Sequence, residues 1–186
     1  MVKTKEEPLK TDQELYQAWR DGDIEGFKAL FERYQRRLYQ VILGWSKNPS
    51  WAEELFQESW VRVIEHKDDF DPNKKFSSWL FQIALNLTRD YWRKQKRVKI
   101  SDLEQSELID AKENPEQILA EKETQKQVLN ALGQLSEVEQ EVFMLRHFGG
   151  MSFSEIAELL GINLNTVLSR MHQAVKHLKK IIGDIQ

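Results

Sequence analysis

Apolar side chains recur every three or four residues along most of this 186-residue chain, and no stretch shows the β-branched alternation of a strand. The clearest pattern runs from Phe76 to Tyr91, where one apolar face persists for four helical turns. Proline follows Asn48 and Asp71, and proline disfavours helical geometry in the residue before it, so helices are expected to break there. The sequence therefore predicts an all-α fold.

Aromatic residues and charge divide the chain unevenly. All six Trp, all four Tyr and six of the nine Phe lie before residue 93. Residues 89–97 then carry five basic side chains against one acid, a balance of +4, whereas residues 98–123 carry three against eight, a balance of −5. A charged segment with few large apolar groups is typical of a linker. We therefore expect two small helical domains, 12–97 and 123–186, joined by a flexible acidic linker at 98–122 and preceded by a charged tail at 1–11.

The composition excludes several classes of site. The chain has no cysteine, which rules out disulfides, zinc–thiolate centres, iron–sulfur clusters and thiol nucleophiles. It has no glycine-rich phosphate loop, and Lys74 stands where a calcium loop starting at Asp69 needs glycine. We therefore expect no catalytic centre, no metal and no cofactor. A charged start and the lack of an apolar run of about 20 residues predict a cytoplasmic protein that does not insert into membranes.

The most specific local pattern lies near the carboxyl end. Ser152 and Glu155 have the spacing of a capping box, which starts a helix. Gly161 is able to adopt the left-handed conformation that ends it, and Asn163 is a good cap for a following helix. Two helices joined by a short glycine-containing turn predict a helix-turn-helix.

The outward face of the second helix has the chemistry of a DNA reader. Asn and Gln are able to bind adenine through two hydrogen bonds, and Leu is able to contact a thymine methyl group. Residues 165–180 carry four basic side chains and no acid. The alternative without DNA binding is an ordinary helical hairpin with a solvated polar face. The candidate DNA contacts are Asn165, Thr166, Leu168, Ser169, Arg170, His172, Gln173 and Lys176.

Two segments carry a family resemblance. AEELFQESWVRV (residues 52–63) and FDPNKKFSSWLFQIALNLTRDYWRK (residues 70–94) resemble region 2 of bacterial sigma factors, while LSEVEQEVFMLR (residues 135–146) and the helix-turn-helix are similar to region 4. The short length points to the extracytoplasmic-function (ECF, group 4) class. The resemblance implies a protein that binds core RNA polymerase, through its β′ clamp and β subunits, and directs it to promoters. Region 2 would recognise and melt the −10 element, region 4 would read the −35 element, and an anti-sigma factor is implied as a further partner.

The resemblance also implies where polymerase docks. In the family, the helix that matches residues 52–66 binds the clamp helices of the largest polymerase subunit. The alternative for such a helix is an ordinary solvated charged face, and this chain has Glu54 where the family has Asp. The matching positions, expected on the side opposite Leu55 and Val63, are Glu54, Gln57, Glu58 and Arg62.

For the −10 element, the family flips one base into a pocket formed by a loop, here 70–75, and an Asn on the next helix, here Asn86. Phe76, Trp79 and Tyr91 lie on the apolar stripe and are expected in the core. Phe70, Phe81 and Trp92 are the better candidates for exposure, where aromatic rings stack on unpaired bases. The expected −10 contacts are Phe70, Asp71, Asn73, Lys75, Phe81, Asn86, Arg89, Trp92, Arg93, Lys94 and Arg97.

The second helix of the helix-turn-helix departs from the common family pattern, and the role of the acidic linker has two alternatives. Leu168 and Gln173 stand where Arg or Lys is frequent, and Asn165 where Gly is frequent, so the usual −35 motif is in doubt. The acidic linker would, in this family, pass through polymerase channels, whereas a plain solvated tether fits its composition equally well.

Three other classes of protein are weighed against this one. A stand-alone helix-turn-helix regulator, with an amino-terminal half that senses or dimerises, would bind DNA tightly without polymerase. A sigma-like antagonist would bind polymerase without opening DNA, and it would not need the aromatic and basic stretch at 70–97. An enzyme is the least supported class, because no convergent set of polar residues is apparent.

Overall fold

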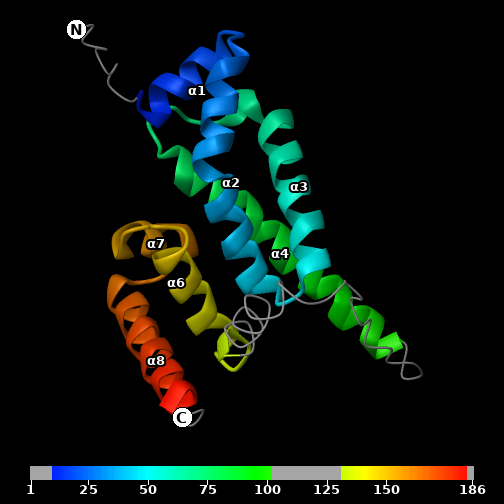
Figure 1. The fold of residues 1–186 in the computed structure, drawn as a ribbon, viewed down its shortest axis with the longest axis vertical. Coiled ribbons are helices and arrows are strands. Elements are labelled where there is room, and N and C mark those ends of the chain that lie inside the picture. The colour runs from blue at the N-terminus through cyan, green and yellow to red at the C-terminus, as the bar shows by residue number, and fades with distance from the viewer. Residues whose placement is uncertain (1–9, 102–130, 184–186) are drawn as a thin grey trace, which may run out of the picture.

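The computed structural model describes residues 10–101 and 131–183, and the regular structure in these two ranges is entirely helical, as the sequence predicts (Figure 1). The helices form two groups. The amino-terminal unit comprises α1 (Asp12–Arg20), α2 (Ile24–Ser46), α3 (Pro49–Glu65), the short 3-10 helix η1 (Lys67–Asp69) and α4 (Phe76–Ser101). The carboxy-terminal unit comprises α6 (Glu137–His147), α7 (Phe153–Leu160) and α8 (Leu164–Gly183).

Local capping explains where the first helices begin and end. The Thr11 side chain and Glu14 form a capping box at the start of α1. Lys47 adopts the left-handed conformation, with φ of 58°, and ends α2. The Asn48 side chain then accepts a hydrogen bond of 3.2 Å from the Trp51 N–H, with Pro49 at the first position of α3. The break expected at Asn48 is therefore confirmed.

The core of the amino-terminal unit is built around α2. This helix contacts α1, α3 and α4, and its apolar residues Leu30, Leu38 and Ile42 are completely buried among them. Phe76 of α4 is buried as the sequence predicts, whereas Trp79 is half-exposed. Burial of apolar surface stabilises a fold by about 25 cal/mol per Å². The apolar surface buried along α2 is therefore the main stabilising contribution to this unit.

The expectation that Phe70 and Phe81 are exposed is wrong. Phe81 is 0% exposed and Phe70 is 4% exposed. Because α4 packs against α1, α2 and α3 together, its buried face is wider than one apolar stripe and includes Phe81. Phe70 is held in an aromatic cluster, with its ring 4.6 Å from Tyr16 and 5.0 Å from Trp79. Neither ring is available to stack on a base.

The carboxy-terminal unit contains the predicted helix-turn-helix. Ser152 and Glu155 form the capping box of α7, and Gly161 ends it with φ of +66°. The Asn163 side chain accepts a hydrogen bond of 2.8 Å from the Asn165 N–H at the start of α8. Ile156 of α7 is completely buried, so the two helices share one small apolar core.

The two units pack on each other through α2 and α6, and Figure 1 shows the three carboxy-terminal helices grouped beside α2. Gly44 of α2 lies so close to Met144 of α6 that a Cβ atom built on it would come within 2.2 Å of the methionine Cε. Gln140, only 3% exposed, donates a hydrogen bond to the Gly44 carbonyl oxygen. The absence of a side chain at Gly44 therefore permits the contact.

The predicted domain boundaries are met only in part by the described residues. Helix α4 continues to Ser101, so residues 98–101 extend the helix instead of starting the linker. The remainder of the predicted linker at 98–122, and residues 1–9 of the predicted tail at 1–11, lie outside the described residues. The division of the chain at these boundaries stays a prediction.

The burial of Phe81 makes a stability prediction. We expect Phe81→Ala to lower the free energy of unfolding by about 3–5 kcal/mol, because it removes a fully buried ring and leaves a cavity. Urea denaturation followed by circular dichroism measures this change. If Phe81→Ala instead keeps the stability of wild type and loses DNA binding, Phe81 belongs to the DNA-binding surface and not to the core.

Candidate polymerase and promoter interfaces

The outer side of α3 presents the four residues expected to dock on polymerase. Glu54, Gln57 and Arg62 are exposed and Glu58 is half-exposed, while Leu55 on the opposite side is buried. The Arg62 Nε donates a hydrogen bond of 2.8 Å to Glu58 Oε1. The four side chains therefore share one face, as predicted.

Two exposed apolar residues of α3 escaped the sequence reasoning. Val61 is 45% exposed and Ile64 is 52% exposed. Val61 follows Gln57 by four residues and precedes Arg62, so helical geometry puts it within the polar face described above. That spacing is the signal by which it could have been found. An apolar centre with a polar rim is the usual anatomy of a protein–protein interface.

The loop before α4 is ordered by its own side chains. The Asp71 carboxylate accepts hydrogen bonds of 3.0 Å from both the backbone N–H and the side-chain amide of Asn73. The bond from the Asn73 backbone, followed by the one from its side chain, lowers the pKa of Asp71. Asp71, Asn73 and Lys75 are all exposed, so the loop offers polar groups to a ligand.

The exposed side of α4 carries predicted DNA-binding cations. Asn86, Arg89, Arg93 and Lys94 are exposed. The Asn86 side-chain oxygen accepts a hydrogen bond of 3.0 Å from Gln82, which orients its amide.

Two further predicted −10 contacts on α4 differ from these exposed residues. Trp92 is half-buried, with its ring 5.8 Å from that of Trp51. It is therefore only partly available for stacking. The side chain of Arg97 lies outside the described part of the structure.

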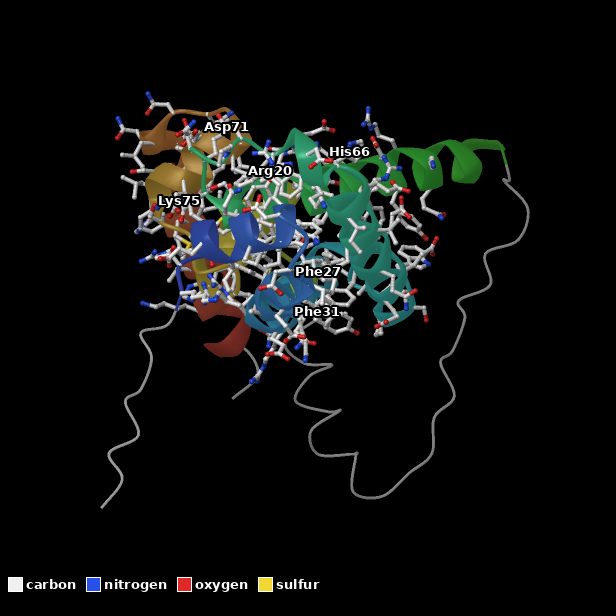
Figure 2. The ribbon with its side chains drawn as sticks, turned by 90° about the horizontal axis from the view of Figure 1, so that it is seen from above. Arg20, Phe27, Phe31, His66, Asp71 and Lys75 are labelled. Carbon is white, nitrogen blue, oxygen red and sulfur yellow. The ribbon has the colours of Figure 1, made fainter. Side chains whose placement is uncertain are left out.

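Two of these cations are paired with acids of the other unit. The Lys75 Nζ lies 2.9 Å from Glu155 Oε1 of α7. Arg89 donates two hydrogen bonds to Glu141 of α6, from Nε to Oε1 at 2.9 Å and from Nη2 to Oε2 at 3.0 Å. Figure 2 shows Asp71 and Lys75 on the side of the amino-terminal unit where α7 lies. The sequence did not predict these ion pairs.

Glu155 sits in an unusual electrostatic setting. Its partial burial acts to raise the pKa, but hydrogen bonds from Lys75 and Ser152, together with the Lys75 charge, outweigh burial and lower the pKa to about 2. The same contact raises the pKa of Lys75. Both groups are therefore charged at neutral pH.

The outer face of α8 presents most of the predicted −35 contacts. Seven of them are exposed, whereas Arg170 is half-buried. Leu164, which the sequence reasoning missed, is 41% exposed, and Leu168 one turn later is 42% exposed. Their four-residue spacing on one helix face is the signal that predicts Leu164 as a neighbour of Leu168. The exposed set comprises Asn165, Thr166, Leu168, Ser169, His172, Gln173 and Lys176.

The described part of the chain shows neither a cluster of metal ligands nor a membrane-spanning helix. Within residues 10–101 and 131–183, no group of three or more His, Asp or Glu side chains is arranged to hold a metal ion. Nor does this part of the chain contain a helix with the length and apolar character needed to cross a membrane.

Comparisons with known proteins agree with this architecture. Residues 30–98 match the sequence model of sigma-70 region 2, and residues 125–178 match that of sigma-70 region 4. The chain is 30% identical to the ECF RNA polymerase sigma factor SigW of Bacillus subtilis (strain 168), over 88% of this chain and 92% of SigW. The chain belongs to the ECF class of sigma-70 factors. The sigma factor CarQ of Myxococcus xanthus is 29% identical, over 90% of this chain and 95% of CarQ.

Solved structures show the same fold. A structure of CnrH in complex with the cytosolic domain of CnrY matches with a TM-score of 0.74 and 25% identity, over 94% of this sigma factor and 99% of CnrH. The sigma factor RpoE of Bartonella quintana, in complex with the anti-sigma factor NepR, matches in fold with a TM-score of 0.70, 21% identity and coverage of 86% and 98%.

The family membership establishes the general function. This sigma factor associates with core RNA polymerase and directs initiation at promoters. A stand-alone regulator is not favoured, because the region 2 match covers most of the amino-terminal unit, which that alternative leaves without a role.

The low pKa of Glu155 predicts a pH-dependent stability. The carboxylate stabilises the folded chain fully above its ordinary pKa of 4.5, and this contribution is lost as pH falls towards 2. We therefore expect wild-type protein to melt at a higher temperature than Glu155→Gln at neutral pH, with the difference shrinking below 4.5. Thermal denaturation at a series of pH values measures it. A difference that stays constant to about pH 3 contradicts the assignment.

Proposed function

We propose that three surfaces of this sigma factor divide its work. The outer face of α3 docks on core polymerase, the loop 70–75 and the exposed side of α4 bind the −10 element, and the outer face of α8 reads the −35 element. The observation that carries the proposal is the combination of region 2 and region 4 matches, in that order, with 30% identity to an ECF sigma factor over nearly the whole chain.

The polymerase surface combines charge with exposed apolar groups. Glu54, Gln57, Glu58 and Arg62 supply polar contacts to the β′ clamp helices. Val61 supplies the apolar centre, since a side chain that is 45% exposed in the free chain gains burial on docking. This pattern supports docking on protein better than on nucleic acid, because two of the four polar residues are acids.

The −10 surface combines hydrogen-bonding groups with cations. Asn86 offers a donor and an acceptor to a base edge, and the loop residues Asp71 and Asn73 lie before the same helix. Lys75, Arg89, Arg93, Lys94 and Arg97 neutralise phosphates, which makes binding strongly dependent on salt. Trp92 is the remaining aromatic candidate for stacking, because Phe70 and Phe81 are buried.

The −35 surface is less cationic than is common in the family. Leu164 and Leu168 present exposed apolar groups that fit thymine methyls, while Gln173 fits adenine. Asn165, Thr166, Ser169 and His172 add polar groups along the same helix, and Arg170 and Lys176 take phosphates. The set favours a −35 element rich in A·T pairs.

Further partners and the location follow from this role. We infer an anti-sigma factor as a partner, since the RpoE structure compared above holds that sigma factor together with the anti-sigma factor NepR, and the CnrH structure likewise holds a second protein, the cytosolic domain of CnrY. The chain acts in the cytoplasm, where polymerase and chromosome meet. The polymerase carries out the bond-forming chemistry, so this chain acts without a catalytic step of its own.

Run-off transcription tests the proposal. We expect purified sigma-free core polymerase to produce discrete transcripts from genomic fragments only when this chain is added.

The α3 surface is tested by its affinity for core polymerase. Glu54→Ala/Gln57→Ala should weaken binding to core by roughly tenfold, which corresponds to about 1.4 kcal/mol for an interface of this kind. The matched control is Gln13→Ala/Glu32→Ala, which removes one amide and one carboxylate from exposed positions of α1 and α2. Equal binding of both double variants contradicts the α3 assignment.

The −35 assignment makes a separate prediction. Gln173→Ala should change the preference at one base pair of the −35 element by about 1–3 kcal/mol, because a base-edge contact is lost. Lys176→Ala should weaken binding to every −35 sequence alike and reduce the salt dependence. Holoenzyme affinities for a set of single-base −35 variants measure both effects. A uniform loss for Gln173→Ala would show that it positions the helix and reads no base.

A further inference from the structure

Helix α1 has no part in the three surfaces proposed above, which lie on α3, α4 and α8. It nevertheless lies close to the connection between α3 and α4, residues 66–75, which contains η1 and the −10 loop 70–75. In Figure 2, Arg20 at the carboxyl end of α1 lies on the same side of the molecule as His66 and Asp71 of this connection. The contacts between α1 and the connection therefore bear on the −10 surface.

The connection 66–75 has few attachments of its own. Phe70 is its one buried residue and Lys67 is half-buried, while all the others are exposed. Its 3-10 helix η1 has no buried residue and no side-chain hydrogen bond at its start. A single 3-10 turn has poor hydrogen-bond geometry and is weakly stable by itself. Within the amino-terminal unit, the position of the connection therefore depends on Lys67 and Phe70.

Tyr16 of α1 contacts both of these residues. Its hydroxyl donates a hydrogen bond of 2.6 Å to the Lys67 carbonyl oxygen, 51 positions further along the chain. Its ring packs edge-on against Phe70, with 4.6 Å between the ring centroids. Tyr16 is itself 0% exposed, so the surrounding core fixes where its ring and hydroxyl lie. One side chain of α1 thus holds the connection at its two attached positions.

Trp19 strengthens the same attachment. The Lys67 Nζ lies 5.7 Å from the centroid of the Trp19 ring, within the range of a cation–π interaction. The Trp19 ring packs edge-on against Tyr16 at 6.1 Å and tilts against Phe27 of α2 at 4.9 Å. Helix α1 is therefore a link between α2, at the centre of the unit, and the connection.

The hydroxyl of Tyr16 is the specific part of this link. A phenylalanine ring would fill the same space, so the bond to Lys67 is what the tyrosine adds. Burial raises the pKa of Tyr16, so the hydroxyl stays protonated and remains a donor at neutral pH. Phe70 is also held by Trp79 of α4, at 5.0 Å, whereas the bond to the Lys67 carbonyl comes from α1.

The polar groups proposed to bind the −10 element begin directly after this attachment. Asp71 follows Phe70, and Lys75 precedes Phe76, the buried first residue of α4. The end of the loop at Phe76 is fixed by α4, so its remaining freedom depends on how firmly the end at Phe70 is held. A loop that is already ordered loses less conformational entropy on binding and therefore binds more tightly.

We propose that Tyr16 is a positioning residue for −10 recognition, which holds the loop 70–75 in its binding conformation through the Lys67 carbonyl and the Phe70 ring. The inference rests on the −10 surface assigned under the proposed function. Tyr16 is buried and does not touch DNA itself. Loss of its hydroxyl should therefore impair −10 binding and spare both docking on core polymerase and −35 reading, which use α3 and α8.

Tyr16→Phe tests the hydroxyl alone. We expect holoenzyme made with this variant to bind a fluorescent single-stranded −10 oligonucleotide roughly three- to tenfold more weakly than wild type, the range of one hydrogen bond. Its affinities for core polymerase and for a −35 duplex should equal those of wild type. Wild-type affinity of Tyr16→Phe for the −10 oligonucleotide rejects the inference.

Tyr34→Phe is the matched control. It also removes one hydroxyl from a buried tyrosine of the same unit, where Tyr34 donates a hydrogen bond to Asp12. Arg33 binds the same carboxylate, so α1 stays attached to α2 in this variant. We expect Tyr34→Phe to lower the melting temperature and to keep wild-type −10 affinity. Equal weakening of −10 binding in both variants would indicate a general loss of stability and overturn the positioning role.

A second readout follows the loop without DNA. Because the chain has no cysteine, Lys74→Cys provides one site for a nitroxide label, at an exposed loop position outside the proposed −10 contacts. We expect the electron paramagnetic resonance spectrum of the free chain to show a more mobile label in Tyr16→Phe than in wild type or Tyr34→Phe. Weaker −10 binding with unchanged label mobility contradicts positioning as the cause.

A double-mutant cycle distinguishes failure of this inference from failure of the proposed function. Asn73→Ala/Lys75→Ala removes two −10 groups of the loop, and in that background Tyr16→Phe should change −10 affinity by less than about twofold. A full Tyr16→Phe effect there means that Tyr16 acts elsewhere, and the inference is wrong. If Asn73→Ala/Lys75→Ala weakens −10 binding and Tyr16→Phe does not, the inference alone is rejected. If Asn73→Ala/Lys75→Ala binds as wild type does, the loop assignment is rejected and the inference with it.

Discussion

Burial of α2 is the constraint on which the rest of the structure depends. This 23-residue helix contacts α1, α3 and α4 through fully buried residues such as Leu30 and Leu38, and its carboxyl-terminal part meets α6 at Gly44. One helix thus forms the centre of the amino-terminal core and also the surface on which the carboxy-terminal unit packs. The amino-terminal core is completed by α1, α3 and α4, which all contact this helix.

The functional surfaces follow from which faces this packing leaves open. Helix α3 buries Leu55 and Val63 in the core and therefore leaves the opposite side, with Glu54 and Gln57, exposed. Helix α4 is covered by three helices of its own unit, so its cations project from the remaining side, where Arg89 meets α6. The face proposed for polymerase and the face proposed for the −10 element are neighbours on this bundle, because Arg62 of α3 and Asn86 of α4 line the same cavity of about 400 Å³.

Local chemistry explains what the sequence predicted correctly and tertiary packing explains what it did not. The helix-turn-helix was predictable because Ser152, Gly161 and Asn163 act within a few residues of their own helices. The burial of Phe81 was not predictable, since it depends on how many neighbouring helices cover α4, and a periodic pattern does not encode that number. The pair of Lys75 and Glu155 spans eighty positions, so no local pattern predicts it. The polar residues of the exposed α3 face were predicted correctly. Val61 was overlooked because an apolar residue in a helix is usually expected in the core.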